Sequence, residues 1–243
     1  MIYKANVIYK ILLYFYQNFL HMNIQEEFSK AIQFIAHHQD GEIAETLKYR
    51  GLEYNMIYGV SSNILYGFAK TIEKNQELAM LLWNEDFREA KLLAFMVANP
   101  ETINNQQLET MVQGCINHEM VEIGALHLFS KIPNAIQKSY EWAQSEEEYV
   151  KMTAYMIISH LAISLKNVKF SDLAKFLPLY ERDFTHGSYF VRKTLVNSFQ
   201  EVAFRKPGIK APIVKATKKL LEQNIGTEFE LQAKDMLHVL NYC

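Results

Sequence analysis

Candidate chemistry is concentrated in the segment Asn117–Glu122, which combines an imidazole with a carboxylate. His118 and Glu122 stand four residues apart, so on a helix they are neighbours on one face. The residues that follow, 123–129, are almost wholly apolar, and burial against them would suit the carboxylate to stabilising positive charge on a substrate. An ion pair at the start of a helix is the structural alternative. Both interpretations stay open on these residues alone.

The same segment gives only weak support for a metal site or a nucleophile. His118 and Glu122 resemble a truncated zinc-protease pattern, but Glu122 stands where that pattern requires a second histidine. His127 has the spacing of a third ligand but would lie on a different face of the helix. Cys115 is too close to His118 in sequence for a nucleophile whose base must lie across a cleft. We therefore expect no metal ion and no cofactor.

Basic residues gather in one stretch, although the formal net charge of the chain is only −2. Residues 186–219 contain one acidic residue, Glu201, so the stretch carries +7 and the remainder −9. Such asymmetry is typical of a surface that contacts a phosphate backbone. A solvated pair of lysine-rich helices is the alternative. The eight basic residues are Arg192, Lys193, Arg205, Lys206, Lys210, Lys215, Lys218 and Lys219.

The elements that must position these residues are predicted to be helices. Only 9 glycines and 5 prolines occur in 243 residues, and 49% of the chain is hydrophobic, which favours helices joined by short loops. Apolar residues recur at helical spacing, as in residues 64–72 after possible caps at Ser61 and Ser62. Strand-like alternation is missing. Later helices are expected at 103–115, 118–131, 134–144, 146–165, 170–182, 187–205, 209–223 and 227–242.

About a dozen helices with short connections predict an all-α solenoid of stacked helix pairs, with a concave face for a partner. We expect one domain over residues 22–243 and an appendage without chemistry at residues 1–21. That appendage is too interrupted by charge for a membrane span and lacks a signal-peptide cleavage site. Two distant cysteines, Cys115 and Cys243, form no disulfide framework. We therefore expect a cytoplasmic monomer that does not enter a membrane.

Several segments resemble the DNA alkylation repair family, the HEAT-like alkylpurine DNA glycosylases, over about residues 50 to 222. The most specific is Arg88–Ala94; the others are Tyr58–Ser61, Ala69–Lys70, Glu77–Ala79, Leu82–Trp83, Glu141–Ala143, Ser145–Lys151 and Tyr189–Lys193. The resemblance implies a curved α–α solenoid of HEAT-like repeats that cradles duplex DNA in a basic concave groove. It also implies base excision repair of cationic N3- or N7-alkylated purines without a metal or cofactor.

The family's site uses an aspartate and two tryptophans, and the resemblance carries these roles over to different residue types. Glu122 falls on the aspartate and keeps its charge with one more methylene. His118 falls on the first tryptophan and could stack on a sugar when neutral. Ser198 falls on the second and offers no aromatic face, while Phe199 lies about 100° further round the helix. The residues expected to contact DNA are Arg192, Lys193, Ser198, Arg205, Lys206 and Lys210.

Three hypotheses about function therefore stay open. The chain binds DNA and retains weak glycosylase activity through Glu122; or it is a catalytically inactive relative that binds DNA non-specifically or recognises altered DNA structure; or it is a helical-repeat scaffold for a protein or peptide partner. The first two predict salt-dependent binding to DNA, because each neutralised phosphate releases counterions. The third does not.

Overall fold

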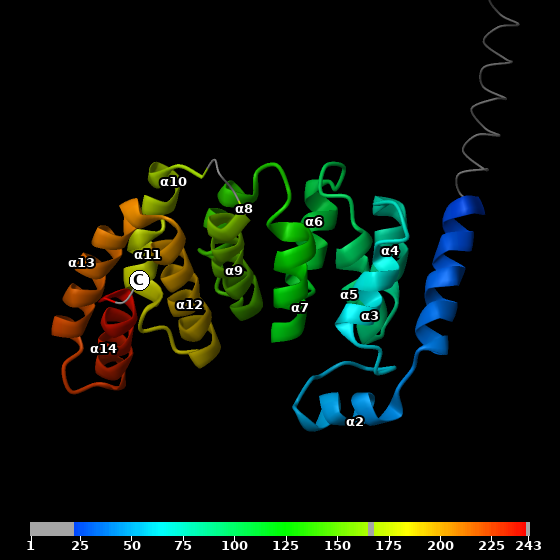
Figure 1. Ribbon diagram of the computed structural model, residues 1–243, viewed down its shortest axis with the longest axis horizontal. Helices are drawn as coiled ribbons and strands as arrows, with labels where there is room; N and C mark the ends of the chain where they lie inside the picture. The colour runs from blue at the N-terminus through cyan, green and yellow to red at the C-terminus, as the bar shows by residue number, and fades with distance from the viewer. Residues whose placement is uncertain (1–21, 165–167, 242–243) are drawn as a thin grey trace, which may run out of the picture. The chain divides into compact units, whose positions relative to one another are not determined.

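The computed structural model of the chain describes residues 22–164 and 168–241. Within these residues the regular secondary structure is all helical, which confirms the predicted all-α class (Figure 1). The chain divides into two compact units, one up to Thr102 and one from Ile103. The single domain expected over 22–243 stays a prediction, and the expected appendage, residues 1–21, lies outside the described residues.

The first unit is built around one almost completely buried helix. A helix over residues 22–37 is followed by α2 (Gly41–Tyr49), α3 (Ser62–Ala69), α4 (Gln76–Asn84) and α5 (Arg88–Val97). All residues of α5 except Lys91 are buried, and α5 packs against both α3 and α4. Ser61 caps α3, since its hydroxyl accepts a hydrogen bond from the Ile64 amide, as the sequence predicts.

Two charged residues at the start of α5 hold the segment that leads into α3. The Glu89 carboxylate accepts hydrogen bonds from the amides of Tyr58, Gly59 and Val60 at 3.0, 2.9 and 3.2 Å. Arg88 donates to the Val60 carbonyl at 2.8 Å and to Glu89 at 2.9 Å. Gly59 has a φ of +83°, and a Cβ there would lie 1.9 Å from a backbone oxygen of α2's cap, so glycine is required. The most specific piece of the family pattern is therefore structural.

The second unit consists of paired helices. It contains α6 (Asn105–Gln113), α7 (His118–Gly124), the π-helix η1 (Ala125–Phe129), α8 (Ala135–Trp142), α9 (Glu148–Ser164), α10 (Phe170–Ala174), α11 (Leu177–Asp183), α12 (Tyr189–Arg205), α13 (Pro207–Gln223) and α14 (Glu228–Asn241). The expected helices match these bounds to within a few residues, with two exceptions. The stretch 118–131 continues as a π-helix after residue 124, and 170–182 is broken into α10 and α11.

Contacts in the second unit arrange the helices as pairs within layers. The helix α9 packs against α7 and α12, and α12 packs in turn against α14. Their partner helices α8, α11 and α13 pack against α9, α12 and α14 (Figure 1). The contacts of α9 with both α7 and α12 place these three helices next to one another.

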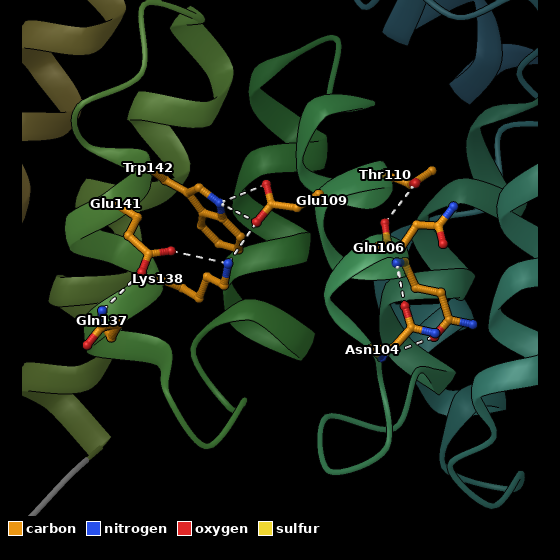
Figure 2. A network of polar contacts seen from close by, with 9 residues as sticks. Asn104, Gln106, Glu109, Thr110, Gln137, Lys138, Glu141 and Trp142 are labelled. Carbon is orange, nitrogen blue, oxygen red and sulfur yellow. Dashed lines mark hydrogen bonds and ion pairs between the residues drawn. The ribbon is translucent and has the colours of Figure 1, made fainter.

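A polar network ties α6 to α8 (Figure 2). The Trp142 indole donates to the Glu109 carboxylate at 3.1 Å, and Lys138 pairs with Glu109 at 3.0 Å and with Glu141 at 3.2 Å. Burial opposes the charge of Lys138, but its hydrogen bonds to both glutamates raise its pKa. The Glu141–Trp142 part of the family pattern is therefore also structural, and the Trp142 side chain is buried.

A second buried network joins α11 to α9. Asp183 accepts two hydrogen bonds from Arg182, at 2.6 and 2.7 Å, and one from the Tyr155 hydroxyl, and it pairs with Lys151 at 3.5 Å. Arg182 also donates to the Ala143 carbonyl at 2.7 Å. Burial alone would raise the pKa of Asp183, but the hydrogen bonds from Arg182 and Tyr155 hold it below its usual value. The network fixes the position of α9 in the unit.

Candidate functional site

A cleft of about 400 Å³ opens on the second unit where α7, α9 and α12 meet. It brings together residues that the sequence singled out in separate segments: His118 and Glu122 from α7, and Lys193 and Ser198 from α12. The helix α9 contributes two lining residues, and α12 contributes most of the lining. The remaining lining residues are Met156, Ser159, Phe190, Thr194, Asn197 and Glu201.

The α7 wall follows from local sequence. The Asn117 side chain caps the helix by accepting a hydrogen bond from the Met120 amide at 3.0 Å. Met120 and Val121 are buried, whereas His118 and Glu122 are exposed on the opposite face. The shared face confirms the inference from their spacing. Glu122 is exposed, so the burial that would have suited the carboxylate to stabilising positive charge is not present.

The charge of Glu122 acts on one histidine of α9, His160. His160 lies on α9 next to Ser159, and burial lowers its pKa below the usual value. The Glu122 charge acts in the opposite direction and the Lys131 charge adds to the lowering. The lowered pKa favours the neutral form of the His160 imidazole.

The α12 wall differs from the sequence-based expectation. Ser198 is only 3% exposed, and Phe199 is buried, with its ring centroid 4.5 Å from that of Tyr180. Phe190, two turns earlier, is 56% exposed and lines the cleft. An aromatic face is thus present, but it comes from a residue that the sequence analysis did not select. Its spacing of three residues from Lys193 was the signal that could have found it.

Arg192 does not lie where a phosphate contact requires. Its side chain is only 9% exposed, and its guanidinium donates to the carbonyls of His186 and Gly187 at 2.5 and 3.1 Å. The same group lies over the Phe229 ring, 5.2 Å from the centroid. The predicted phosphate contact conflicts with this position, because the guanidinium is already held by backbone oxygens and a ring.

The other basic residues lie on more than one surface. Lys193 lines the cleft. Arg205 is exposed and pairs with Glu201 at 3.4 Å. Lys206 precedes α13, and Lys210 lies on α13 away from the cleft lining. The stretch that is continuous in sequence is therefore divided in space, and only Lys193 of the expected basic contacts lines the cleft.

The donor set of the cleft does not suggest a metal centre. Over residues 22–164 and 168–241, no group of three or more histidine, cysteine, aspartate or glutamate side chains is placed to hold a metal ion. His127 is buried in η1, while His118 is exposed on α7, so the two do not share a face. None of the helices in the described part of the chain combines the length and apolar character that a membrane crossing requires.

The paired helices and the cleft define a helical-repeat protein, and comparison with known families agrees. A family model described as DNA alkylation repair enzyme matches residues 24–225. The chain belongs to the DNA alkylation repair family, which confirms the resemblance found in its sequence.

A solved structure has a similar fold. It is described as representing a new family of proteins related to the HEAT-like repeat DNA glycosylases, with affinity for branched DNA structures. The two chains align with a TM-score of 0.71 and 18% sequence identity, over 79% of this chain and 82% of the other. The likeness confirms the HEAT-like repeat architecture. No curated protein matches the chain.

Proposed function

We propose that this protein binds DNA across the cleft formed by α7, α9 and α12. The observation that supports the proposal is the gathering of His118, Glu122, Lys193 and Ser198 in one cleft. These four residues come from two segments that the family resemblance had connected to DNA. The exposed amine of Lys193 is suited to a phosphate, and the exposed ring of Phe190 is suited to stacking on a base or sugar.

The cleft also supports slow excision of a cationic alkylated purine. Such a base is a good leaving group, so the protein needs only to stabilise positive charge that develops on the deoxyribose. Glu122 presents a carboxylate at the surface, where a DNA sugar can approach it. No nucleophile or metal is needed for this step. Water completes the hydrolysis.

A second candidate function is binding of DNA without excision. Its support is Ser198, which has no ring and is buried, so the position to which the resemblance assigns a stacking group supplies none. The protein of similar fold is described as having affinity for branched DNA structures, and we include branched DNA among the ligands proposed for this chain.

Release of free alkylated purine from methylated duplex DNA tests the first candidate. Glu122→Gln keeps the side-chain size but removes the charge, so we expect release to fall roughly 100- to 1,000-fold, the usual cost of a lost charge-stabilising group. Glu228→Gln, an exposed change on α14 outside the cleft, is the matched control and leaves release unchanged. Release is quantified by mass spectrometry.

The outcomes separate the candidates. Equal release by the native protein and Glu122→Gln would contradict a role for this carboxylate. Release at the buffer level together with salt-dependent DNA binding would favour the second candidate. Failure of the native protein to bind any DNA at low salt would overturn both.

A further inference from the structure

The helix α13 carries a second basic surface, which we call the α13 lysine face. Lysines recur along it at helical spacing, so they project from one side of the helix. Lys215, Lys218 and Lys219 are exposed and Lys210 is half-buried. The opposite side of α13 is apolar and packs into the unit through Ile209, Ile213, Ala216, Thr217 and Leu220. The residues of the lysine face are Pro207, Lys210, Ala211, Val214, Lys215, Lys218, Lys219 and Glu222.

The shape of this face suits an extended ligand. Between the lysines lie small residues, Ala211 and Val214, and the side chains enclose a shallow hollow of about 830 Å³. From Pro207 to Glu222 the helix rises about 22 Å. That length matches about six base pairs of duplex, at roughly 3.4 Å each. A phosphodiester backbone could therefore follow the hollow with lysines along it.

Two of the four lysines on this face, Lys215 and Lys218, are not neutralised by other described residues of the protein. Lys219 hydrogen-bonds to Glu181 of α11. In the described part of the chain, by contrast, the ammonium groups of Lys215 and Lys218 have neither a hydrogen bond nor an ion pair. Glu222 is the single acid that lines the hollow. Exposed lysines on a helix cost the protein little stability, so their presence alone indicates no ligand. A row of lysines with one acid among them is, however, complementary in charge to a polyanion.

The α13 lysine face is separate from the cleft. The two surfaces share no residue. The helix α12 packs against α9, which lines part of the cleft, and also against α13, and it lies between them in Figure 1. A short, straight duplex can therefore bind in the cleft without contacting the α13 lysine face.

We propose that the α13 lysine face binds the phosphate backbone of a second DNA segment while the cleft holds the first. The inference rests on the proposed function, since it takes DNA as the ligand of the cleft. Branched DNA presents two duplex arms that are joined to each other. Binding of the second arm is then intramolecular and strengthens the complex without new base contacts.

The test compares two double variants on two DNA substrates. Lys215→Gln with Lys218→Gln removes two free charges from the lysine face. Lys70→Gln with Lys169→Gln removes two exposed charges elsewhere and is the matched control. Each protein is titrated with a four-way junction and with a linear duplex of equal base-pair number, at several salt concentrations.

We expect the native protein to bind the junction more tightly than the linear duplex. The α13 double variant loses at least about 10-fold in junction affinity at low salt, and the slope of log affinity against log salt becomes shallower by about 1.8, because each phosphate contact contributes about 0.9. Its affinity for the linear duplex stays within about twofold of native, as does the control variant on both substrates.

Several results would overturn the inference. One is an α13 double variant that loses no more junction affinity than the control. Another is binding of vesicles of phosphatidylserine and phosphatidylcholine, or of polyglutamate, that the variant abolishes while junction affinity is unchanged. Loss of linear-duplex binding in the α13 variant but not in Lys193→Gln would instead overturn the cleft as the DNA site, a failure of the proposed function and not of the lysine face.

Discussion

Two helical glutamates, Glu89 of α5 and Glu122 of α7, show how differently the two units use a carboxylate. Glu89 in the first unit is 0% exposed, and three backbone amides and Arg88 surround it. Glu122 in the second unit is exposed at the rim of a cleft. The first is part of the fold, because its removal would leave buried donors and a buried cation. Glu122, in contrast, can be replaced by another residue type without unfolding the protein.

The contrast explains why the family is recognisable although its site residues differ. Arg88–Ala94, the most specific match to the family pattern, holds the segment before α3, and Glu141–Trp142, a further match, joins α8 to α6. Packing and buried hydrogen bonds restrict such residues strongly. Residues on the cleft are limited only by what they bind. Membership of the family is therefore stronger evidence for the architecture than for the chemistry.

The largest expected effect is on stability, from a substitution of the buried glutamate Glu89. Glu89→Gln removes the charge that compensates Arg88 inside the first unit, so we expect a loss of about 3–5 kcal/mol in the free energy of unfolding. Urea unfolding measures it. Glu122→Gln, at an exposed position, should change stability by no more than about 0.5 kcal/mol. Equal losses in the two variants would contradict the distinction between them.

Asp183 tests whether burial, and not the unit, decides the role of a carboxylate. It lies in the same unit as the cleft but is buried, so Asp183→Asn should cost about 3 kcal/mol by leaving the buried Lys151 uncompensated. The pKa of Asp183 is lowered in the folded state. Its contribution is therefore complete above the unfolded pKa of about 3.9 and is lost as pH falls towards the lower folded value.

This acid-side loss of stability should be smaller in Asp183→Asn than in the native protein. Urea unfolding at a series of pH values from neutral down to about pH 2 measures the difference. Parallel pH profiles for the two proteins would show that Asp183 does not supply the dependence.

Phe190 tests the cleft without disturbing the core. Phe190→Ala should weaken DNA binding by about 1–3 kcal/mol, the usual contribution of a stacked aromatic. Phe204→Ala is the matched control, since Phe204 is on the same helix and is 55% exposed but does not line the cleft. Fluorescence anisotropy with labelled DNA compares the two. An equal loss in both would argue against stacking in the cleft.

The smallest expected effect concerns Lys193. Lys193→Gln should weaken binding to all DNA sequences alike and make the salt slope shallower by about 0.9, because a backbone contact carries no base information. Titrations of several duplexes over a range of salt concentrations measure both quantities. A loss confined to one sequence would contradict a phosphate contact. Arg192→Ala, in contrast, should lower stability, because Arg192 holds the turn at 186–187.

Local signals made most of the helices predictable. Asn104 and Ser188 cap α6 and α12 with their side chains, and Asn117 caps α7, so the chain itself marks where these helices begin. The break between α10 and α11 also has a local mark, because Pro178 lies in the first turn of α11, where proline is favoured, and disfavours a helix that runs through it. The expected helix over 170–182 does not take this proline into account.

The site was predictable on α7 and less so on α12. The four-residue spacing of His118 and Glu122 is enough to place both on one face. On α12, aromatic residues occur on both sides of the helix, with Phe199 buried and Phe190 and Phe204 exposed. Periodicity cannot decide which of these faces the core, because the rotation of the helix is set by contacts with α9, α13 and α14. The prediction that Ser198 and the remaining basic residues contact DNA stays a prediction.

The π-helix η1 has a consequence for how the chain can vary between related proteins. Its hydrogen bond from the Ser130 amide to the Ala125 carbonyl spans five residues, one more than in an α-helix. If a single residue of η1 were deleted, the π-helical turn would become an α-helical turn, and the flanking residues would keep their positions. The register of His118 and Glu122 against α12 would be preserved. Homologues that differ by one residue at this position can therefore present the same two side chains to the cleft.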